Sequence, residues 1–112
     1  MLLLKNRLRK KQEFEEVYKK GKSFSFENIT LRFVKNKLEC SRIGFVVSGK
    51  FSKKAVERNK IKRQLRAILR KNIQLLNSGL DIVIIPKKGK PISYFLLQEN
   101  VEKALQKAKI TS

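Results

Sequence analysis

The side chains that could perform acid–base or metal chemistry in this chain are few and dispersed. The 112 residues include no histidine, so the most common general base and metal ligand is missing. Among the nine acidic residues only Glu13, Glu15 and Glu16 cluster, and basic residues flank them on both sides. Such a cluster is typical of the first turns of a helix, where carboxylates complement the helix dipole. We therefore expect no catalytic residues and no metal site in the protein itself.

The many basic side chains suit a different chemistry, the binding of phosphate groups. The chain has 28 Lys and Arg against 9 Asp and Glu, which gives a formal net charge of +19 at pH 7. A compact protein with such a charge repels itself and tolerates the charge most readily when a polyanion neutralises it. The partner expected from composition is therefore a nucleic acid or an anionic membrane surface.

Nearly half of this net charge lies in residues 50–71, and we call the basic residues of this segment the basic ridge. Within it Glu57 is the only acidic residue. At 100° per residue Asn59, Arg63 and Arg66 share one helical face, opposite the apolar positions. A solvated helix face usually mixes charges of both signs, so a phosphate-binding face is favoured over a merely solubilising one. The ten members of the basic ridge are Lys50, Lys53, Lys54, Arg58, Lys60, Lys62, Arg63, Arg66, Arg70 and Lys71.

One arginine of the basic ridge departs from this pattern. Arg58 lies one turn before Ile61 and close to the apolar side of the predicted helix. Its long side chain either snorkels along the edge of a sheet or points into a groove between helix and sheet. The second arrangement would place a guanidinium group where extended RNA could lie.

The aromatic residues bear on the kind of nucleic acid. Phe14 and Tyr18 stand one helical turn apart in a lysine-rich segment, where they could stack on unpaired bases. The same spacing fits two residues of a core, so both interpretations stay open. The remaining phenylalanines are assigned mostly to the core, and they are Phe24, Phe26, Phe33, Phe45, Phe51 and Phe95.

The elements that must position these side chains follow from the periodicity of apolar residues. In residues 11–20 the acidic side chains come first and the basic ones last, and Gly21 follows, which is typical of a helix. Residues 80–86 form an apolar run typical of a strand that is covered on both faces. The expected elements are a helix over 11–20, strands over 24–26 and 29–33 with a bulge or break at 28, a strand over 42–48, a helix over 55–76 ended by 78–79, a strand over 80–86, a basic loop over 87–91 and a helix from 93 or 94 onward.

The helix over 55–76 has the strongest period in the chain. A single stripe about 100° wide is expected to pack on the sheet. The pattern as a whole predicts an α+β or α/β protein with one core, because so short a chain supports no second core. The stripe consists of Ile61, Leu65, Ile68, Leu69 and Asn72.

Residues 54–66 resemble the signature helix of the protein subunit of bacterial ribonuclease P. The family pattern is Ala, any two residues, Arg-Asn, any two, Lys-Arg, any two, Arg. The family often has Arg-Asn-Arg where this chain has Lys60 third, which keeps the charge but not the bidentate geometry of arginine. The similarity runs almost end to end, through 7–11, 14–21, 45–48 and 81–89. All six fixed positions are filled, by Ala55, Arg58, Asn59, Lys62, Arg63 and Arg66.

The resemblance implies a fold and an activity. The implied fold is a single small α+β domain over residues 1–112, an α/β sandwich of order α-β-β-β-α-β-α. Its four-stranded sheet would contain a left-handed βαβ crossover, against the usual right-handed rule. The implied activity is removal of the 5′ leader from precursor tRNA. In that enzyme the RNA subunit hydrolyses the phosphodiester with magnesium that it mainly binds itself, and the non-catalytic protein enhances substrate and magnesium binding.

The resemblance also implies partners and site residues. The partners are the catalytic RNA and precursor tRNA with its 5′ leader, with no obligate protein partner. Phe14 and Tyr18 match aromatic positions of a cleft for the leader. Arg32 falls where some relatives have a cleft tyrosine, so we expect a phosphate contact there. The resemblance implies that the helix residues facing the catalytic RNA and the substrate are Arg58, Asn59, Lys60, Lys62, Arg63 and Arg66. The predicted RNA-binding residues also include Lys50, Lys53, Lys54 and Arg70 of the basic ridge.

Three other functions share some of these features. A structural RNA-binding protein, such as a ribosomal one, has the same charge but needs no leader cleft. An independent protein nuclease would cut RNA with magnesium and no RNA subunit. A membrane-surface role fits poorly, because the sheet needs the apolar residues of the strongest helix and no exposed aromatic anchor is expected.

The chain is expected to be cytoplasmic. Cys40 is the only cysteine, which excludes an internal disulfide and fits a reducing compartment. The apolar start, Met1 to Leu4, is far too short for a signal-peptide core or a membrane span.

Overall fold

The computed structural model describes residues 6–77, 79–87 and 93–110. The order of elements confirms the predicted α-β-β-β-α-β-α arrangement of an α+β protein. The predicted loop over 88–91, Ser78 and the Met1 to Leu4 start lie outside the described residues. The elements are α1 (Lys11–Lys20), β1 (Lys22–Phe26), β2 (Ile29–Lys35), β3 (Arg42–Phe45), α2 (Ala55–Asn72), the 3₁₀ turn η2 (Ile73–Leu75), β4 (Leu80–Pro86) and α3 (Tyr94–Lys107).

The four strands form one mixed sheet of order β1-β2-β4-β3. β1 pairs with β2 and β2 with β4 in antiparallel fashion, whereas β3 and β4 are parallel and joined through α2. The N-terminal segment covers the outer edge of β3, because Arg7 bridges to Ile43 and the Leu8 amide donates to the Ile43 carbonyl at 3.0 Å. The left hand of the β3-α2-β4 crossover stays a prediction.

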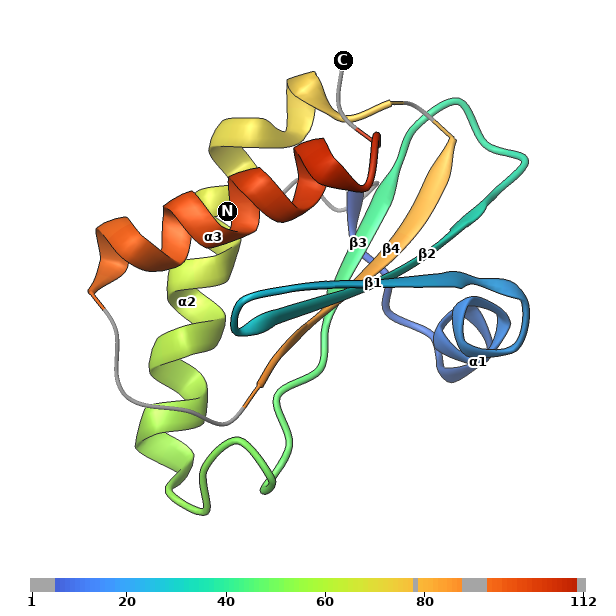
Figure 1. Ribbon diagram of the computed structural model, residues 1–112. Helices are drawn as coiled ribbons and strands as arrows, with labels where there is room; N and C mark the ends of the chain where they lie inside the picture. Colours follow the sequence, from blue (N-terminus) through green and yellow to red (C-terminus); the bar gives the residue numbers. More distant parts are fainter. Residues whose placement is uncertain (1–5, 78, 88–92, 111–112) are drawn as a thin grey trace.

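The helices lie in two layers on the sheet, with α1 on one face and α2 and α3 on the other (Figure 1). Successive side chains of a strand point to opposite faces. In β4, Ile82 and Ile84 therefore pack under α2 and α3, and Val83 packs under α1. All three are fully buried, which confirms the prediction of a strand covered on both faces.

The larger half of the core lies between the sheet and α2 with α3. The buried residues of α2 are the five predicted from its period, Ile61, Leu65, Ile68, Leu69 and Asn72. A polar residue is tolerated in this stripe because its groups are satisfied. The Asn72 side-chain amide donates to the Ile68 carbonyl at 2.8 Å and to a Glu102 carboxylate oxygen at 2.9 Å.

The smaller half of the core lies between the sheet and α1. Leu8, Val17 and Val83 are buried there, and Phe14 packs against them. A Cβ at Gly44 would lie 2.5 Å from the Phe14 ring, so a side chain at this point of β3 would displace the ring. The close approach lets the Phe14 ring lie on the backbone of the sheet.

Four predicted boundaries differ from the structure. Strand β1 begins at Lys22 rather than at residue 24, and β2 ends at Lys35 rather than at residue 33. The helix predicted over 55–76 ends at Asn72 and is followed by η2, and strand β3 ends at Phe45 rather than Ser48. After η2 the chain turns to bury Leu76, and the Asn77 amide donates to the Ile110 carbonyl at 2.8 Å. That contact with the end of the chain is tertiary, so local periodicity did not contain it.

Two local features also differ from expectation. The break at residue 28 is a two-residue hairpin turn in which Glu27 has a positive φ of 52°. Phe95 is not a core residue, because 82% of its surface is exposed. Near the start of α3, the buried Leu97 side chain points toward the core. Phe95 lies about 200° from Leu97 on the helical wheel, so its side chain points toward solvent. The chain therefore has an exposed aromatic residue that the sequence did not predict.

Candidate nucleic-acid interface

The basic ridge lies on and just before α2, with its side chains directed away from the sheet. Arg63, Arg66 and Arg70 are exposed, as are the lysines of the loop that precedes α2. Only Arg58 and Lys62 are half-buried. Because the opposite stripe of α2 is buried, the structure confirms that the apolar and the basic faces of this helix are opposed.

The start of α2 is positive for two reasons. A helix N-terminus has a partial positive charge, and the basic residues Lys53, Lys54 and Arg58 lie around it. Glu57 is the only acidic residue of the first turn, and its carboxylate accepts a hydrogen bond from the Ser52 hydroxyl at 2.6 Å. Lysines at this end oppose the helix dipole, so an anion bound there would relieve the repulsion.

Arg58 contacts the loop that precedes α2. Its Nη1 donates to the Ser52 carbonyl oxygen at 2.8 Å, in the loop before α2. Ser52 also accepts from the Lys54 amide through its hydroxyl at 3.1 Å. The half-buried Arg58 therefore holds the basic loop against the start of the helix.

The three residues predicted for a leader cleft meet on the α1 face of the sheet. Tyr18 is 41% exposed, and the Arg32 guanidinium lies over its ring at 5.3 Å from the centroid. Arg32 Nη2 also donates to the Tyr18 carbonyl oxygen at 2.7 Å, which satisfies an acceptor at the end of α1. Phe14 lies deeper and contributes most of its ring to the smaller core.

A polar strip of the sheet continues from Arg32. Ser23 faces Arg32 across the β1–β2 pair, and Ser25 faces Thr30 with their hydroxyl oxygens 3.1 Å apart. Opposed residues of two strands share a face, so these hydroxyls lie on the same side as Tyr18. Among the described residues, Arg32 Nε is the only buried side-chain nitrogen or oxygen without a hydrogen-bond partner. The strip combines a ring, hydroxyls and a cation.

The sheet separates this cleft from the basic ridge. Tyr18 and Arg32 lie on the α1 face, whereas α2 lies on the opposite face (Figure 1). An RNA molecule that touched both the ridge and the Tyr18–Arg32 pair would therefore have to pass around the sheet.

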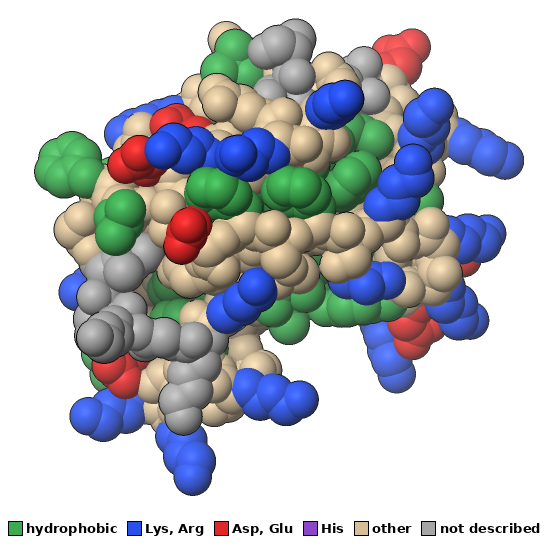
Figure 2. Space-filling view, in the orientation of Figure 1, with side chains coloured by type: hydrophobic (Ala, Val, Ile, Leu, Met, Phe, Trp, Pro, Cys, Tyr) green, Lys and Arg blue, Asp and Glu red, His purple; other side chains and the backbone are tan. Residues whose placement is uncertain are grey.

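Basic side chains also outnumber acidic ones on the face seen in Figure 2, where α3 and β1 lie nearest the viewer.

An ion-pair cluster at the start of α1 was not predicted. Arg42 Nη1 contacts a Glu13 oxygen at 2.5 Å, and its Nε and Nη2 contact the two Asp81 oxygens at 2.8 and 2.6 Å. The side-chain amide of Asn36 donates to an Asp81 carboxylate oxygen at 2.8 Å. These residues are far apart in the sequence, so no local pattern joins them. The one available signal was the acidic Asp81 inside the apolar run over 80–86.

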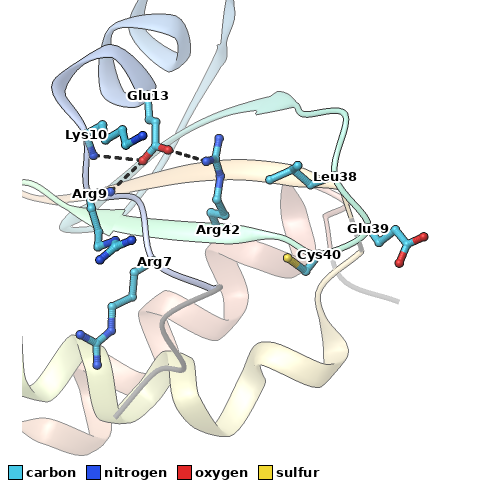
Figure 3. Close-up of a pocket in the computed structure, with 8 residues that line it drawn as sticks. All are labelled: Arg7, Arg9, Lys10, Glu13, Leu38, Glu39, Cys40 and Arg42. Atoms are coloured by element: carbon cyan, nitrogen blue, oxygen red, sulfur yellow. Dashed lines mark hydrogen bonds and ion pairs between the residues drawn. The ribbon is translucent and has the colours of Figure 1, made fainter.

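The cluster lies beside an open pocket of about 410 Å³ (Figure 3). Burial by itself raises the pKa of the Glu13 carboxyl, but the amides of Arg9 and Lys10 and the Arg42 charge outweigh it, so the pKa lies below its ordinary value. The hydrogen bonds to Asp81 raise the pKa of Arg42. The pocket is lined by Arg7, Arg9, Lys10, Glu13, Leu38, Glu39, Cys40 and Arg42.

The described residues contain no group of three or more His, Cys, Asp or Glu side chains that could hold a metal ion. Two acidic side chains that the fold brings close to each other, Glu13 and Asp81, are both paired with Arg42. Within the same described ranges, no helix is long and apolar enough to cross a membrane.

Comparison with known proteins identifies the family. A family model described as Ribonuclease P matches residues 2–109. The chain belongs to the ribonuclease P protein family. It is 49% identical over 83 residues to the ribonuclease P protein component of Finegoldia magna, which covers 74% of this chain and 72% of that one. The ribonuclease P protein component of Pseudanabaena is 39% identical over 112 residues, covering 98% and 97% of the two chains.

A solved structure supports the same assignment. The RNase P protein of Staphylococcus aureus superimposes with a TM-score of 0.87 at 30% identity, covering 96% of this chain and 98% of that one. As a ribonuclease P protein component, the chain is a subunit of an endoribonuclease that processes tRNA and has an RNA partner. The α+β fold expected from the resemblance is confirmed.

Proposed function

We propose that the protein binds the 5′ leader of precursor tRNA in the cleft on the α1 face and the catalytic RNA along the basic ridge. The observation that carries the proposal is the exposed Tyr18 ring beside Arg32, on a sheet face that also presents hydroxyl groups. An aromatic ring on an open polar sheet is a stacking platform for unpaired bases. The leader is the single-stranded part of the substrate.

The polar strip beside Tyr18 supports leader binding by other chemistry. The hydroxyls of Ser23, Ser25 and Thr30 donate and accept hydrogen bonds, so they suit base edges and ribose 2′-hydroxyl groups. Arg32 lies within the same strip, and its guanidinium group has the charge and geometry that bind phosphate. We assign Arg32 a phosphate contact with the leader. We assign Phe14 an indirect role, because it packs between α1 and the sheet and supports the helix that carries Tyr18.

The basic ridge supports contact with folded RNA. Over the 18 residues of α2 it extends about 27 Å, which is long enough to follow several phosphates. The positive start of α2 adds its dipole to the charge of Lys53 and Lys54. With about six phosphate contacts, affinity would fall roughly a thousandfold between 50 and 200 mM salt.

We assign bond cleavage to the RNA subunit and magnesium mainly to that subunit. This assignment is supported by the composition, which offers no histidine, and by the engagement of Glu13 and Asp81 with Arg42. The protein then contributes binding and orientation only. We propose a cytoplasmic site of action and no obligate protein partner.

The test is binding and cleavage of matched tRNA precursors with and without a 5′ leader. The protein is reconstituted with a bacterial ribonuclease P RNA, and the RNA alone serves as the reference. We expect the protein to strengthen binding of the leader-bearing precursor and to leave the leaderless tRNA nearly unaffected. Equal effects on both substrates would instead favour a structural RNA-binding protein. Cleavage by a preparation freed of RNA would show a protein nuclease.

A further inference from the structure

The ion pairs that Arg42 makes with Glu13 and Asp81 attach α1 to the sheet. Asp81 lies in the central strand β4 and is 4% exposed, and Arg42 lies at the start of β3. The side chains of Arg42 and Glu13 are 20% and 19% exposed, so both ions are largely removed from water. Charge-assisted contacts of this kind are short and directional. We call Glu13, Arg42 and Asp81 the α1 anchor.

Glu13 is the member of the α1 anchor that belongs to the helix. One of its oxygens pairs with Arg42, and the other accepts from the backbone amides of Arg9 and Lys10 at 2.9 and 3.0 Å (Figure 3). The Glu13 carboxylate therefore binds the backbone just before α1 and also attaches the first turn of α1 to the sheet. At the other end of α1, Arg32 binds the Tyr18 carbonyl.

We infer that Glu13, Arg42 and Asp81 are positioning residues of the leader cleft, a role that rests on the proposed function. Glu13 and Tyr18 are five residues apart on one helix, about 7.5 Å along its axis. A helix moves as a stiff body, so the height of its first turn above the sheet sets the position of the Tyr18 ring. The polar strip near that ring belongs to the sheet, and Asp81 lies in the central strand of the same sheet.

The other ion pairs of α1 do not have this role. Lys11 and Glu15 are 3.9 Å apart and Lys20 and Glu16 are 3.2 Å apart, and both pairs lie within the helix. Their side chains are more than half exposed, and exposed pairs of this kind contribute little. Glu16 therefore provides a matched control, since Glu16→Gln removes one negative charge from the same helix without touching the sheet.

The experiment compares Glu13→Gln and Glu16→Gln in the reconstituted holoenzyme. For each protein, the dissociation constants for precursor tRNA with a leader and for leaderless tRNA are measured. Their ratio is the leader discrimination. We expect Glu13→Gln to reduce that ratio by about fivefold and to leave leaderless binding within about twofold. Glu16→Gln should match the wild-type protein on both substrates, and thermal unfolding confirms that each variant is folded.

Arg42 supplies a second, independent variant. Deleting its charge would leave the buried Asp81 carboxylate without a cation, which strongly destabilises a protein. Arg42→Lys keeps the charge but loses the fork that reaches two carboxylates at once. We expect the same loss of leader discrimination as in Glu13→Gln. The double variant should lose no more than Arg42→Lys alone, because that substitution already breaks the Glu13 contact.

Three results would overturn the inference. Wild-type discrimination in both Glu13→Gln and Arg42→Lys would show that the anchor does not position the cleft. An equal loss for leader-bearing and leaderless substrates would show a general structural role. If the wild-type protein itself does not discriminate, the proposed leader cleft is wrong and the positioning role is wrong with it.

Discussion

The Arg32 guanidinium carbon lies 5.3 Å from the centroid of the Tyr18 ring, and its Nη2 donates to the Tyr18 carbonyl oxygen. The arginine thus joins β2 to the last turn of α1 and covers one face of the ring. In the proposed complex the opposite face of the ring remains for a leader base. A guanidinium behind a ring also strengthens it as a platform through cation–π attraction.

Tyr18→Ala tests the stacking platform. Stacking on an aromatic side chain contributes about 1–3 kcal/mol per base, so affinity for leader-bearing precursor tRNA should fall roughly fivefold to a hundredfold. Leaderless tRNA should bind as before. Equilibrium binding of both substrates to the holoenzyme measures the difference.

Tyr18→Phe is the control for that prediction. It keeps the ring and removes only the hydroxyl, so it should retain most of the leader affinity. Both variants keep the backbone carbonyl that Arg32 binds, so the end of α1 stays attached to the sheet. Leader affinity that is unchanged in Tyr18→Ala would rule out stacking at this residue.

Arg63→Ala and Arg66→Ala test the basic ridge. Both side chains are exposed opposite the buried stripe of α2, so the thermal transition should not change. Affinity for the catalytic RNA should decrease, and the slope of log affinity against log salt should become shallower by about one for each variant. Lys103→Ala on α3 removes one exposed charge elsewhere and should change neither quantity. Loss of the folded transition would show that the faces of α2 are reversed.

The Glu13 carboxylate predicts how stability depends on pH. Its pKa lies below the ordinary value of 4.5, so its ionised form stabilises the folded protein. That contribution is complete above about pH 4.5 and is lost as the pH falls through the lowered pKa. Glu13→Gln should therefore be less stable than the wild-type protein at pH 6, by about 1 kcal/mol for a partly exposed pair.

Urea unfolding over a range of acidic pH values measures this dependence. The difference between wild type and Glu13→Gln should be constant above pH 4.5 and shrink below it. Glu16→Gln, which breaks an exposed pair within α1, should show a much smaller difference. A difference between wild type and Glu13→Gln that persists unchanged into strong acid would mean that the charge of Glu13 contributes nothing.

Gly44→Ala tests the contact between Phe14 and the sheet. The added methyl group would lie 2.5 Å from the Phe14 ring, so the ring must move within a packed core. Overpacking of this kind costs about 1–3 kcal/mol, which thermal unfolding detects as a lower Tm. Gly49→Ala is the matched control, because no atom lies within 4 Å of a Cβ at that position. Equal Tm values for the two variants would contradict the packing described.

Much of the fold was predictable because local periodicity reports which side of an element is buried. The buried stripe of α2 and the two-sided burial of β4 follow from the spacing of apolar residues alone. The end of α2 was not predictable, because Leu76 and Asn77 turn to meet the C-terminal residues. Phe95 was misassigned because side-chain type indicates burial only on average.

The sequence by itself determined the charge, the two faces of α2 and the family motif from Ala55 to Arg66, since all three are properties of neighbouring residues. Only the tertiary structure decided how distant residues meet. It placed Arg32 on Tyr18, Arg42 between Glu13 and Asp81, and α1 on the opposite face of the sheet from α2. The physical reason is that strand pairing and the packing of helices on the sheet bring together residues separated by more than ten positions and leave no period in the sequence.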